Sequence, residues 1–257
     1  MTASRGWLGR LRKQETLPRI PEGTRLYAVG DVHGRLDLLE QLLRQIEDHA
    51  AGRGRKNTLV FLGDYVDRGL QSKGVIDRLL NPGFPDWEIV CLRGNHDQAV
   101  LDFVDDPNIY RTWKELGGAE TLLSYGVMPP RFDDQAVFAE ARDDFLRKCP
   151  PPHLEFLHGL RFFHMAGDYM FVHAGVRPGI ALNSQSPQDM MWIRDEFLQS
   201  DLRLDKVVVH GHSPNERPAV RPNRIGIDTG AYATNCLTAV VLDGEERSFL
   251  ATAAQTK

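Results

Sequence analysis

The sequence predicts an α/β fold with a parallel or mixed sheet and helices on its faces. Three apolar runs typical of buried strands recur about thirty residues apart, at 26–29, 59–62 and 89–92. A glycine-containing turn follows each run, and a segment with helical spacing follows each of the first two turns. This repetition of strand, turn and helix is typical of βαβ units.

The chain of 257 residues is long enough to form one domain with a sizeable core. Its net charge of −4 gives no basic field that would indicate nucleic acid as a partner. Three cysteines, Cys91, Cys149 and Cys236, show no CxxC spacing, so we interpret them as reduced residues of a cytoplasmic protein. No apolar run reaches the roughly 18 residues expected of a transmembrane segment.

Residues 1–22 are predicted to be a flexible basic tail, followed by a single domain at 23–257. Residues 1–19 carry five cationic side chains and only one acid, and they lack the apolar stretch of a signal peptide. Trp7, Leu8 and Leu11 share one face if this segment is helical. Weak contact of the tail with a membrane surface or a partner therefore stays open beside a simple solvated terminus.

The helices and the remaining strands follow in order. Apolar residues at helical spacing predict a helix at 37–49 and a second at 72–80. A mostly helical insert is predicted at about 98–159, and both a lid over the site and a supporting layer are compatible with it. Gly167 and Asp168 suit a hairpin turn. Further strands are predicted at 160–165, 169–172, 207–209, 225–227, 237–242 and 247–250.

Polar side chains follow five of the predicted strands, at the point where each strand ends. In an α/β sheet this edge is where functional sites form, because the carboxyl ends of parallel strands meet there. Flanking glycines allow the chain to turn sharply behind each strand. The residues are Asp31 and His33, then Asp64, Asn95, His173 and His212.

Such a set predicts a site for two divalent metal ions. Carboxylate, amide and imidazole ligands without cysteine suit manganese, iron or zinc. Asp64 is well placed to bridge the two ions. Of His210 and His212 we favour His212 as the ligand, because the Gly211 turn presents it outward. Two such ions clamp a phosphoryl group and lower the pKa of a bridging water toward about 7, which supplies hydroxide as the nucleophile.

His96 follows directly after Asn95 and is predicted to be the general acid that protonates the leaving group. Asp67 is expected to accept from the other ring nitrogen and to hold the tautomer. Asp97 is the rival partner for His96, and we interpret it as support for the local turn.

Two arginines are candidates for binding the phosphate. Arg68 follows Asp67 and offers a bidentate fork to phosphate oxygens. For Arg194 the spacing alone favours phosphate binding no more than a surface ion pair with Asp195 or Glu196.

At these residues the chain resembles the metal-dependent phosphoprotein phosphatases, within the calcineurin-like metallophosphoesterases. The family pattern is GDxHG, GDxVDRG and GNH followed by two histidines. Here it is found, in order, at 30–34, 63–69, 94–96, His173 and His212. The likeness is closer to compact bacterial serine/threonine phosphatases than to the longer eukaryotic ones.

The resemblance implies a central β-sandwich of mixed sheets flanked by helices, and a site that uses two ions, manganese first among them. One departure from the eukaryotic members is that residues 227–231 stand where those carry a tyrosine-containing loop. The implied ligands of the first ion are Asp31, His33 and Asp64, and those of the second are Asp64, Asn95, His173 and His212. His96 and Asp67 are implied to be the acid pair, and Arg68, Arg194 and Asn95 to contact phosphate.

A serine/threonine protein phosphatase is the function that the sequence favours. The alternative is a nucleotide hydrolase similar to the symmetrical bis(5'-nucleosyl)-tetraphosphatases, which typically carry alanine where this chain has Asp67. The substrate is accordingly a phosphorylated protein or a small phosphoester. A catalytically silent binding module on the same fold is a third hypothesis, which the complete set of ligands and His96 disfavours.

Overall fold

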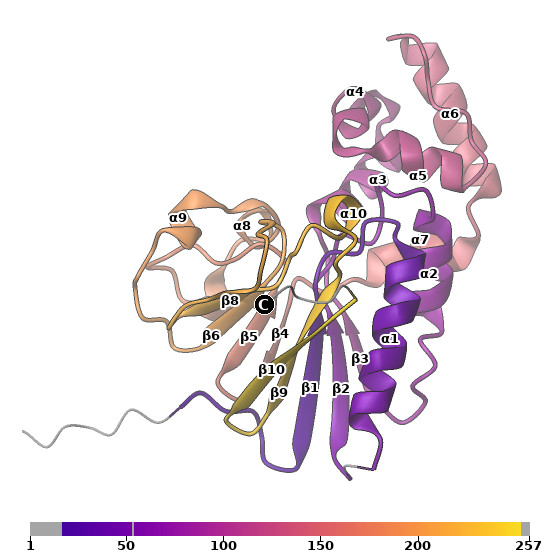
Figure 1. The fold of residues 1–257 in the computed structure, drawn as a ribbon. Coiled ribbons are helices and arrows are strands. Elements are labelled where there is room, and N and C mark those ends of the chain that lie inside the picture. The colour runs from indigo at the N-terminus through magenta and orange to yellow at the C-terminus, as the bar shows by residue number, and fades with distance from the viewer. Residues whose placement is uncertain (1–16, 53, 253–257) are drawn as a thin grey trace, which may run out of the picture.

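Two five-stranded sheets pack face to face at the centre of the molecule, and helices cover the outer face of each (Figure 1). The computed structural model describes residues 17–52 and 54–252. Helices, sheet, sheet and helices therefore follow one another as four layers. This is the β-sandwich of mixed sheets that the resemblance implied.

The first sheet joins three N-terminal strands to two strands from the C-terminus. In spatial order these are β10 (Glu246–Ala251), β9 (Thr238–Asp243), β1 (Thr24–Val29), β2 (Lys56–Phe61) and β3 (Glu88–Cys91). β1, β2 and β3 run parallel, whereas β9 pairs antiparallel with both β1 and β10. Helices α1 (Leu36–Ala50) and α2 (Ser72–Leu80) connect the parallel strands, so the predicted βαβ rhythm is confirmed.

The second sheet is built from the chain that follows the insert. Its spatial order is β4 (Phe163–Ala166), β5 (Tyr169–Val172), β6 (Val207–His210), β8 (Arg224–Gly226) and β7 (Ala219–Val220). β5, β6 and β8 run parallel, and the two edge strands are antiparallel. The predicted hairpin connects β4 to β5. β7 was not predicted, since two residues are too few to show a period.

Short helices complete this half of the molecule. η3 (Leu182–Ser184), α8 (Pro187–Trp192) and α9 (Asp195–Leu198) lie between β5 and β6 in the chain, and α10 (Ala231–Thr234) follows β8. Residues of β5, β6, α8 and α9 share one apolar cluster, which includes Met170, Val208, Met190 and Phe197. The two short helices are thereby fixed to the outer face of the second sheet.

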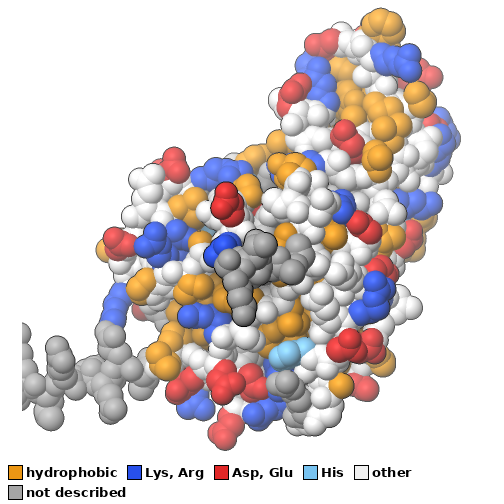
Figure 2. Space-filling model, in the orientation of Figure 1, with side chains coloured by type: hydrophobic (Ala, Val, Ile, Leu, Met, Phe, Trp, Pro, Cys, Tyr) orange, Lys and Arg blue, Asp and Glu red, His pale blue; other side chains and the backbone are white. Residues whose placement is uncertain are grey.

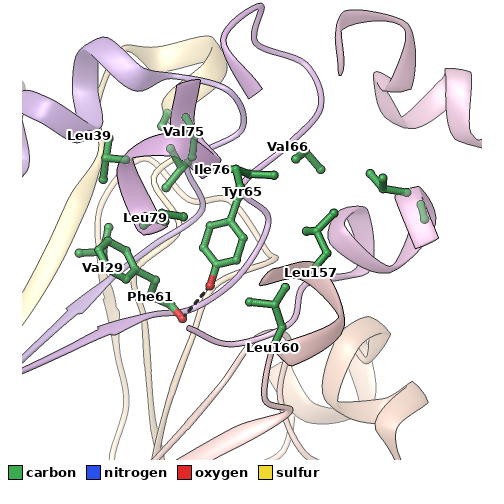
Figure 3. Close-up of a cluster of buried hydrophobic side chains, with 14 of the residues drawn as sticks. Val29, Leu39, Phe61, Tyr65, Val66, Val75, Ile76, Leu79, Leu157 and Leu160 are labelled. Carbon is green, nitrogen blue, oxygen red and sulfur yellow. Dashed lines mark hydrogen bonds between the residues drawn. The ribbon is translucent and has the colours of Figure 1, made fainter. Parts of the chain in front are cut away.

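The central strands of the first sheet, β1, β9 and β2, are buried on both faces: alternate side chains point to opposite sides, and both sides are covered. Leu26, Ala28, Val60 and Leu62 face the second sheet. The intervening residues face α1, α2 and the insert, as Figure 3 shows for Val29 and Phe61. Burying each large side chain of this kind contributes about 1.5–3 kcal/mol.

Tyr65 extends the packing beyond the end of β2. Its ring is fully buried among the side chains in Figure 3, and its hydroxyl donates to the carbonyls of Leu92, at 2.7 Å, and Phe61, at 3.3 Å. The turn that follows β2 is therefore fixed by a buried aromatic anchor. The same turn carries Asp64 and Asp67.

The insert is helical, as predicted. Its elements are α3 (Asn95–Asp105), η1 (Pro107–Ile109), α4 (Tyr110–Trp113), η2 (Lys114–Leu116), α5 (Gly118–Ser124), α6 (Gln135–Lys148) and α7 (Pro151–Gly159). α3 begins before the predicted start at residue 98, because the Asp97 carboxylate accepts the N–H of Gly94 and caps the helix. Pro151 begins α7, in keeping with the preference for proline in the first turn.

α4, α5 and α6 project from the body of the molecule (Figure 1). Hydrophobic side chains gather on this projecting lobe in Figure 2, and Met128 and Phe132 are among the exposed ones. They border a hollow of about 450 Å³ between α6 and the loop before it.

The packed chain begins earlier than the predicted boundary at residue 23. Ile20 is buried between the sheets, and the N–H of Arg19 donates to Asp168 at 3.0 Å. Most of the predicted basic tail, residues 1–16, lies outside the described residues. Within the described part of the chain, no helix is long and apolar enough to cross a membrane.

Candidate metal centre

The structure brings the six predicted ligands together at one end of the sandwich. Asp31 and His33 follow β1, Asp64 follows β2, and Asn95 begins α3. His173 and His212 follow β5 and β6 of the other sheet. All six side chains are buried, with between 0% and 4% of their surface exposed.

Three of these residues have backbone angles that favour glycine. His33, Asp64 and His212 have φ values of 46°, 54° and 62°. The left-handed region costs an L-residue roughly 1–2 kcal/mol, and such strain concentrates at functional sites.

Two glycines leave room for the carboxylates of Asp64 and Asp31. A Cβ atom on Gly94 would lie 2.0 Å from Asp64 Oδ1, and one on Gly211 would lie 2.0 Å from Asp31 Oδ1. Glycine is therefore required at both positions by close packing against a carboxylate. This is a steric reason for the glycines of the motifs.

Asp64 lies at the centre of the cluster. Its Oδ2 is 3.4 Å from His173 Nε2, 3.6 Å from His33 Nε2 and 3.8 Å from His96 Nε2. Among the described residues, two groups could each hold a metal ion, with ligand atoms within 4.8 Å of one another. They are His33–Asp64–His96 and Asp64–His173–His212, so Asp64 is common to both.

Two buried atoms in the site have no partner within the described structure. They are Asp31 Oδ1 and His212 Nε2. Buried polar atoms are almost always hydrogen-bonded, so orphaned ones indicate a missing ligand. Asp31 is in neither group of three, but its orphaned oxygen fits a cation next to them. The residues present therefore suit two cations.

Backbone carbonyls orient two of the imidazoles. His33 Nδ1 lies 2.9 Å from the carbonyl of Val66, and His173 Nδ1 lies 2.9 Å from that of Leu62. Because a carbonyl only accepts, each Nδ1 carries the hydrogen and each Nε2 faces the cluster. His173 Nε2 is also 3.0 Å from Asn95 Oδ1.

Burial and the shared carboxylate set the protonation states. Burial lowers the pKa of His33 to about 3 and that of His212 to about 2, which leaves both neutral. Burial also opposes charge on His173 and Asp64, but their mutual attraction outweighs it. The pKa of His173 rises to about 9, and the pKa of Asp64 falls well below its usual range.

His96 pairs with Asp67, as predicted. Its Nδ1 lies 2.8 Å from Asp67 Oδ2, and both side chains are buried. Although burial lowers the pKa of His96, Asp64 and Asp67 outweigh it and raise the pKa. The rival Asp97 accepts instead from the N–H groups of Asp64, at 2.8 Å, and Tyr65, at 2.9 Å. It supports the turn, as interpreted.

The insert supplies hydrogen bonds to the acid pair. Trp113 Nε1 donates to Asp67 Oδ2 at 2.9 Å, and Thr121 Oγ1 donates to Asp67 Oδ1 at 2.7 Å. The Thr121 hydroxyl also accepts the N–H of Asp67, and the Gly117 carbonyl accepts that of Arg68. The insert thus supports the site, while a role as a lid stays a prediction. Trp113 and Thr121 were not identified from the sequence.

Tyr232 is a further residue that the sequence did not identify. Arg68 lies with its guanidinium 4.4 Å from the Tyr232 ring centre and with Nη2 3.3 Å from His96 Nε2. The Tyr232 ring also meets His33 edge to face, with centres 5.5 Å apart. Tyr232 directly follows the segment 227–231, so a tyrosine lies at the site just beyond those residues.

Arg194 and His210 are two further residues near His212 for which the sequence alone did not decide between a functional and a structural role. Arg194 is exposed between α8 and α9, and its charge helps to lower the pKa of His212. Of the ion pairs formed by described residues, none involves Arg194, and Glu196 pairs with Arg177 instead. His210 packs edge to face against Phe197, with its Nε2 3.4 Å from Arg224 Nη1. It is a packing residue.

Comparison with known proteins places the chain among phosphoesterases. A bis(5'-nucleosyl)-tetraphosphatase (asymmetrical) of Bacillus velezensis is 25% identical over 230 residues, which cover 82% of this chain and 86% of the relative. A symmetrical enzyme of Acidovorax ebreus is 31% identical over 156 residues, which cover 60% and 44% of the two chains. The crystal structure of a proposed diadenosine tetraphosphatase superposes with a TM-score of 0.61 at 22% identity, over 93% of this chain and all of the other. Residues 24–239 match the family described as calcineurin-like phosphoesterase, and the chain belongs to that family.

Proposed function

We propose that this phosphoesterase hydrolyses bis(5'-nucleosyl) tetraphosphates. The family establishes phosphoester hydrolysis as the reaction class. The observation that carries the proposal is Asp64, shared by two ligand groups and lying beside the His96–Asp67 pair. Two relatives whose names state this activity support the choice of substrate, and one of them matches over most of its length.

Two divalent cations would be held by the residues at the strand ends. Asp31, His33 and Asp64 would hold one, and Asp64, Asn95, His173 and His212 the other. When bound, the ions supply charge neutralisation for the phosphoryl group and a water of lowered pKa. The mixture of carboxylate, imidazole and amide ligands suits manganese, iron or zinc, with manganese as our first choice.

The side chains around these ligands bind phosphate and deliver a proton. Arg68 and Arg194 attract the phosphate oxygens, and Asn95 is a further contact. His96 Nε2 is 3.3 Å from Arg68 Nη2, so a phosphate on Arg68 brings its leaving oxygen next to the acid. Asp67 retains the hydrogen on His96 Nδ1, which directs Nε2–H at the leaving group.

A second candidate is the serine/threonine protein phosphatase that the sequence favoured. The specific observation for it is the 2.8 Å contact between His96 and Asp67. A nucleotide leaves as a weakly basic phosphate, whereas serine or threonine leaves as a strongly basic alkoxide that requires a proton. A hydrogen-bonded acid pair is therefore needed more for the phosphatase reaction than for the release of a nucleotide. The silent module is disfavoured, because every predicted ligand lies in the cluster.

The test is hydrolysis with manganese, measured side by side on diadenosine tetraphosphate and on a phosphothreonine peptide. The proposal expects higher kcat/KM on the dinucleotide. Chromatography of the products then gives the position of the cut: ADP alone for a symmetrical cut, and ATP with AMP for an asymmetrical one. Higher kcat/KM on the peptide would overturn the proposal in favour of the phosphatase.

A further inference from the structure

An open pocket of about 370 Å³ lies between α8 and α9, beside the metal centre. Trp192, at the end of α8, and Arg194, two residues later, both line it. Trp192 meets the ligand candidate His212 edge to face, with ring centres 6.3 Å apart. The pocket therefore begins one aromatic ring away from the position where the phosphate is expected.

Trp192 is the large apolar side chain that lies partly exposed in the wall of this pocket. Its neighbours Met191 and Ile193 are buried, whereas 39% of its own surface is exposed. An indole held partly open to solvent at the edge of a charged site has unfilled apolar surface. A flat apolar group that carries a phosphate on its far side would cover it.

The pocket is held in shape by Arg177. Its Nε and Nη2 donate to the two carboxylate oxygens of Asp189 on α8, at 3.0 and 2.6 Å, and its Nη1 pairs with Glu196 on α9. One guanidinium thus ties the two short helices together and pairs with two of the three acids in the wall, while Asp195 is not among its partners. Arg194 also lines the pocket, and among the ion pairs of the described residues none involves it, so its charge is available to an anion.

We propose that Trp192 stacks a nucleobase of the substrate while Arg194 contacts the phosphate attached to the same nucleoside. The inference rests on the proposed nucleotide hydrolase function and assigns the pocket as the site that selects nucleotides. In a nucleotide the base and the phosphate are separated by one ribose, as Trp192 and the metal centre are separated here by the His212 ring. Aromatic platforms of this kind accept any base, because each base offers a π face.

The experiment compares two inhibitors that differ only in the base. AMP and ribose 5-phosphate are titrated against turnover of p-nitrophenyl phosphate by the manganese-loaded full chain. In the wild type we expect AMP to bind about tenfold more tightly, within the range of base–aromatic stacking. Trp192→Ala should remove this difference, and Trp192→Phe should retain most of it. Each constant is measured against the turnover of the same variant.

A direct binding signal accompanies the kinetics. AMP should quench tryptophan fluorescence in the wild type, and the quenching should be lost in Trp192→Phe, although the three other tryptophans of the chain remain. Phe132→Ala is the matched control, because it removes an exposed aromatic side chain on the insert. It should leave the preference for AMP unchanged.

The outcomes separate this inference from the proposed function. If diadenosine tetraphosphate is cleaved but Trp192→Ala leaves the preference for AMP intact, the function stands and the stacking role is wrong. If the wild type shows no preference for AMP, the stacking role is also wrong. If the dinucleotide is not cleaved and yet the preference depends on Trp192, the pocket binds a base and the proposed function fails.

Discussion

The His96–Asp67 pair lies between the metal ligands at the sheet edge and the helical insert, and these two sides are built in different ways. On the sheet side, each ligand comes directly after a strand and is held by its own turn, as with the left-handed backbone of His33 and Asp64. On the insert side, Trp113 and Thr121 reach Asp67 from helices 46 and 54 residues further along the chain. The sheet side is specified locally, and the insert side is specified only by tertiary packing.

This difference divides the site into parts that should respond differently to mutation. Changes on the sheet side should remove the metal ions and with them nearly all activity. Changes on the insert side should leave the ions in place and act only through the geometry of Asp67 and His96.

Asp64→Asn should have the largest effect, since Asp64 is common to both ligand groups. Losing the shared carboxylate weakens binding of both ions, so turnover should fall to near background and bound manganese toward zero. Metal analysis of the purified protein measures this directly. In the wild type, chelation should lower the melting temperature, because the ions bind only the folded state.

The control for this substitution is Asp37→Asn. Asp37 is about half exposed and pairs with Arg35 at the surface, so its loss removes a carboxylate without touching the cluster. Its metal content should equal that of the wild type. Two full equivalents of manganese in Asp64→Asn would contradict the bridging role.

His96→Asn should come second. The general acid is lost while the proposed ligands stay, so turnover should fall by roughly 10²–10⁴-fold on poor leaving groups. A series of aryl phosphates with leaving groups of rising pKa measures the effect, and the loss should grow along the series. A loss of metal equal to that in Asp64→Asn would instead place His96 among the ligands, beside His33 and Asp64.

The sheet side could be predicted because each ligand lies within a few residues of the strand and the turn that position it. An apolar run, a glycine and a polar residue suffice to place Asp31, His33 and Asp64 at one edge of a parallel sheet. The arrangement of the sheets follows less directly from the sequence. The residues alone predicted a sheet with helices on its faces, and the β-sandwich was implied by the family resemblance. Leu26 and Tyr27 are both buried but belong to different apolar clusters, and this explains the sandwich only once both sheets are known.

The insert side and Tyr232 could not be predicted for the same physical reason. Trp113 in a helical pattern is indistinguishable from any other buried aromatic residue until its Nε1–H is seen to donate to Asp67. Tyr232 lies on a four-residue helix, too short to show a period, and its role follows from its contact with Arg68. Neither the contact of Trp113 with Asp67 nor that of Tyr232 with Arg68 produces a recognisable spacing of residues in the nearby sequence.

Trp113→Phe should have a smaller effect than His96→Asn. It removes a hydrogen bond to a charged group, worth about 1.5–3 kcal/mol, and so should cut turnover by at most roughly 10- to 150-fold. Bound manganese should be unchanged. Steady-state kinetics on the leaving-group series, with metal analysis alongside, measures both.

The double variant shows whether Trp113 acts through the acid pair. In the His96→Asn background, Trp113→Phe should cost little further activity, because residues that act as one unit are not additive. Full additivity of the two losses would mean that Trp113 affects turnover by another route, and the division between the two sides would fail.

His153→Phe should have the smallest effect on turnover, because the hydrogen bonds of His153 go to Tyr125 and Asp77 and not to Asp67. Its ring is buried in α7, with Nδ1 2.8 Å from the Tyr125 hydroxyl and Nε2 2.9 Å from Asp77 on α2. Leaving the buried Tyr125 hydroxyl without this partner costs about 1–3 kcal/mol of the free energy of unfolding. At roughly 2–4 °C for each kcal/mol, thermal melting should shift downward by several degrees, while kcat/KM stays at the wild-type value. A fall in kcat/KM as large as that of Trp113→Phe would show that the insert acts on the site as one rigid unit. The contacts of His153 would then control Asp67 as strongly as the direct hydrogen bond from Trp113 does.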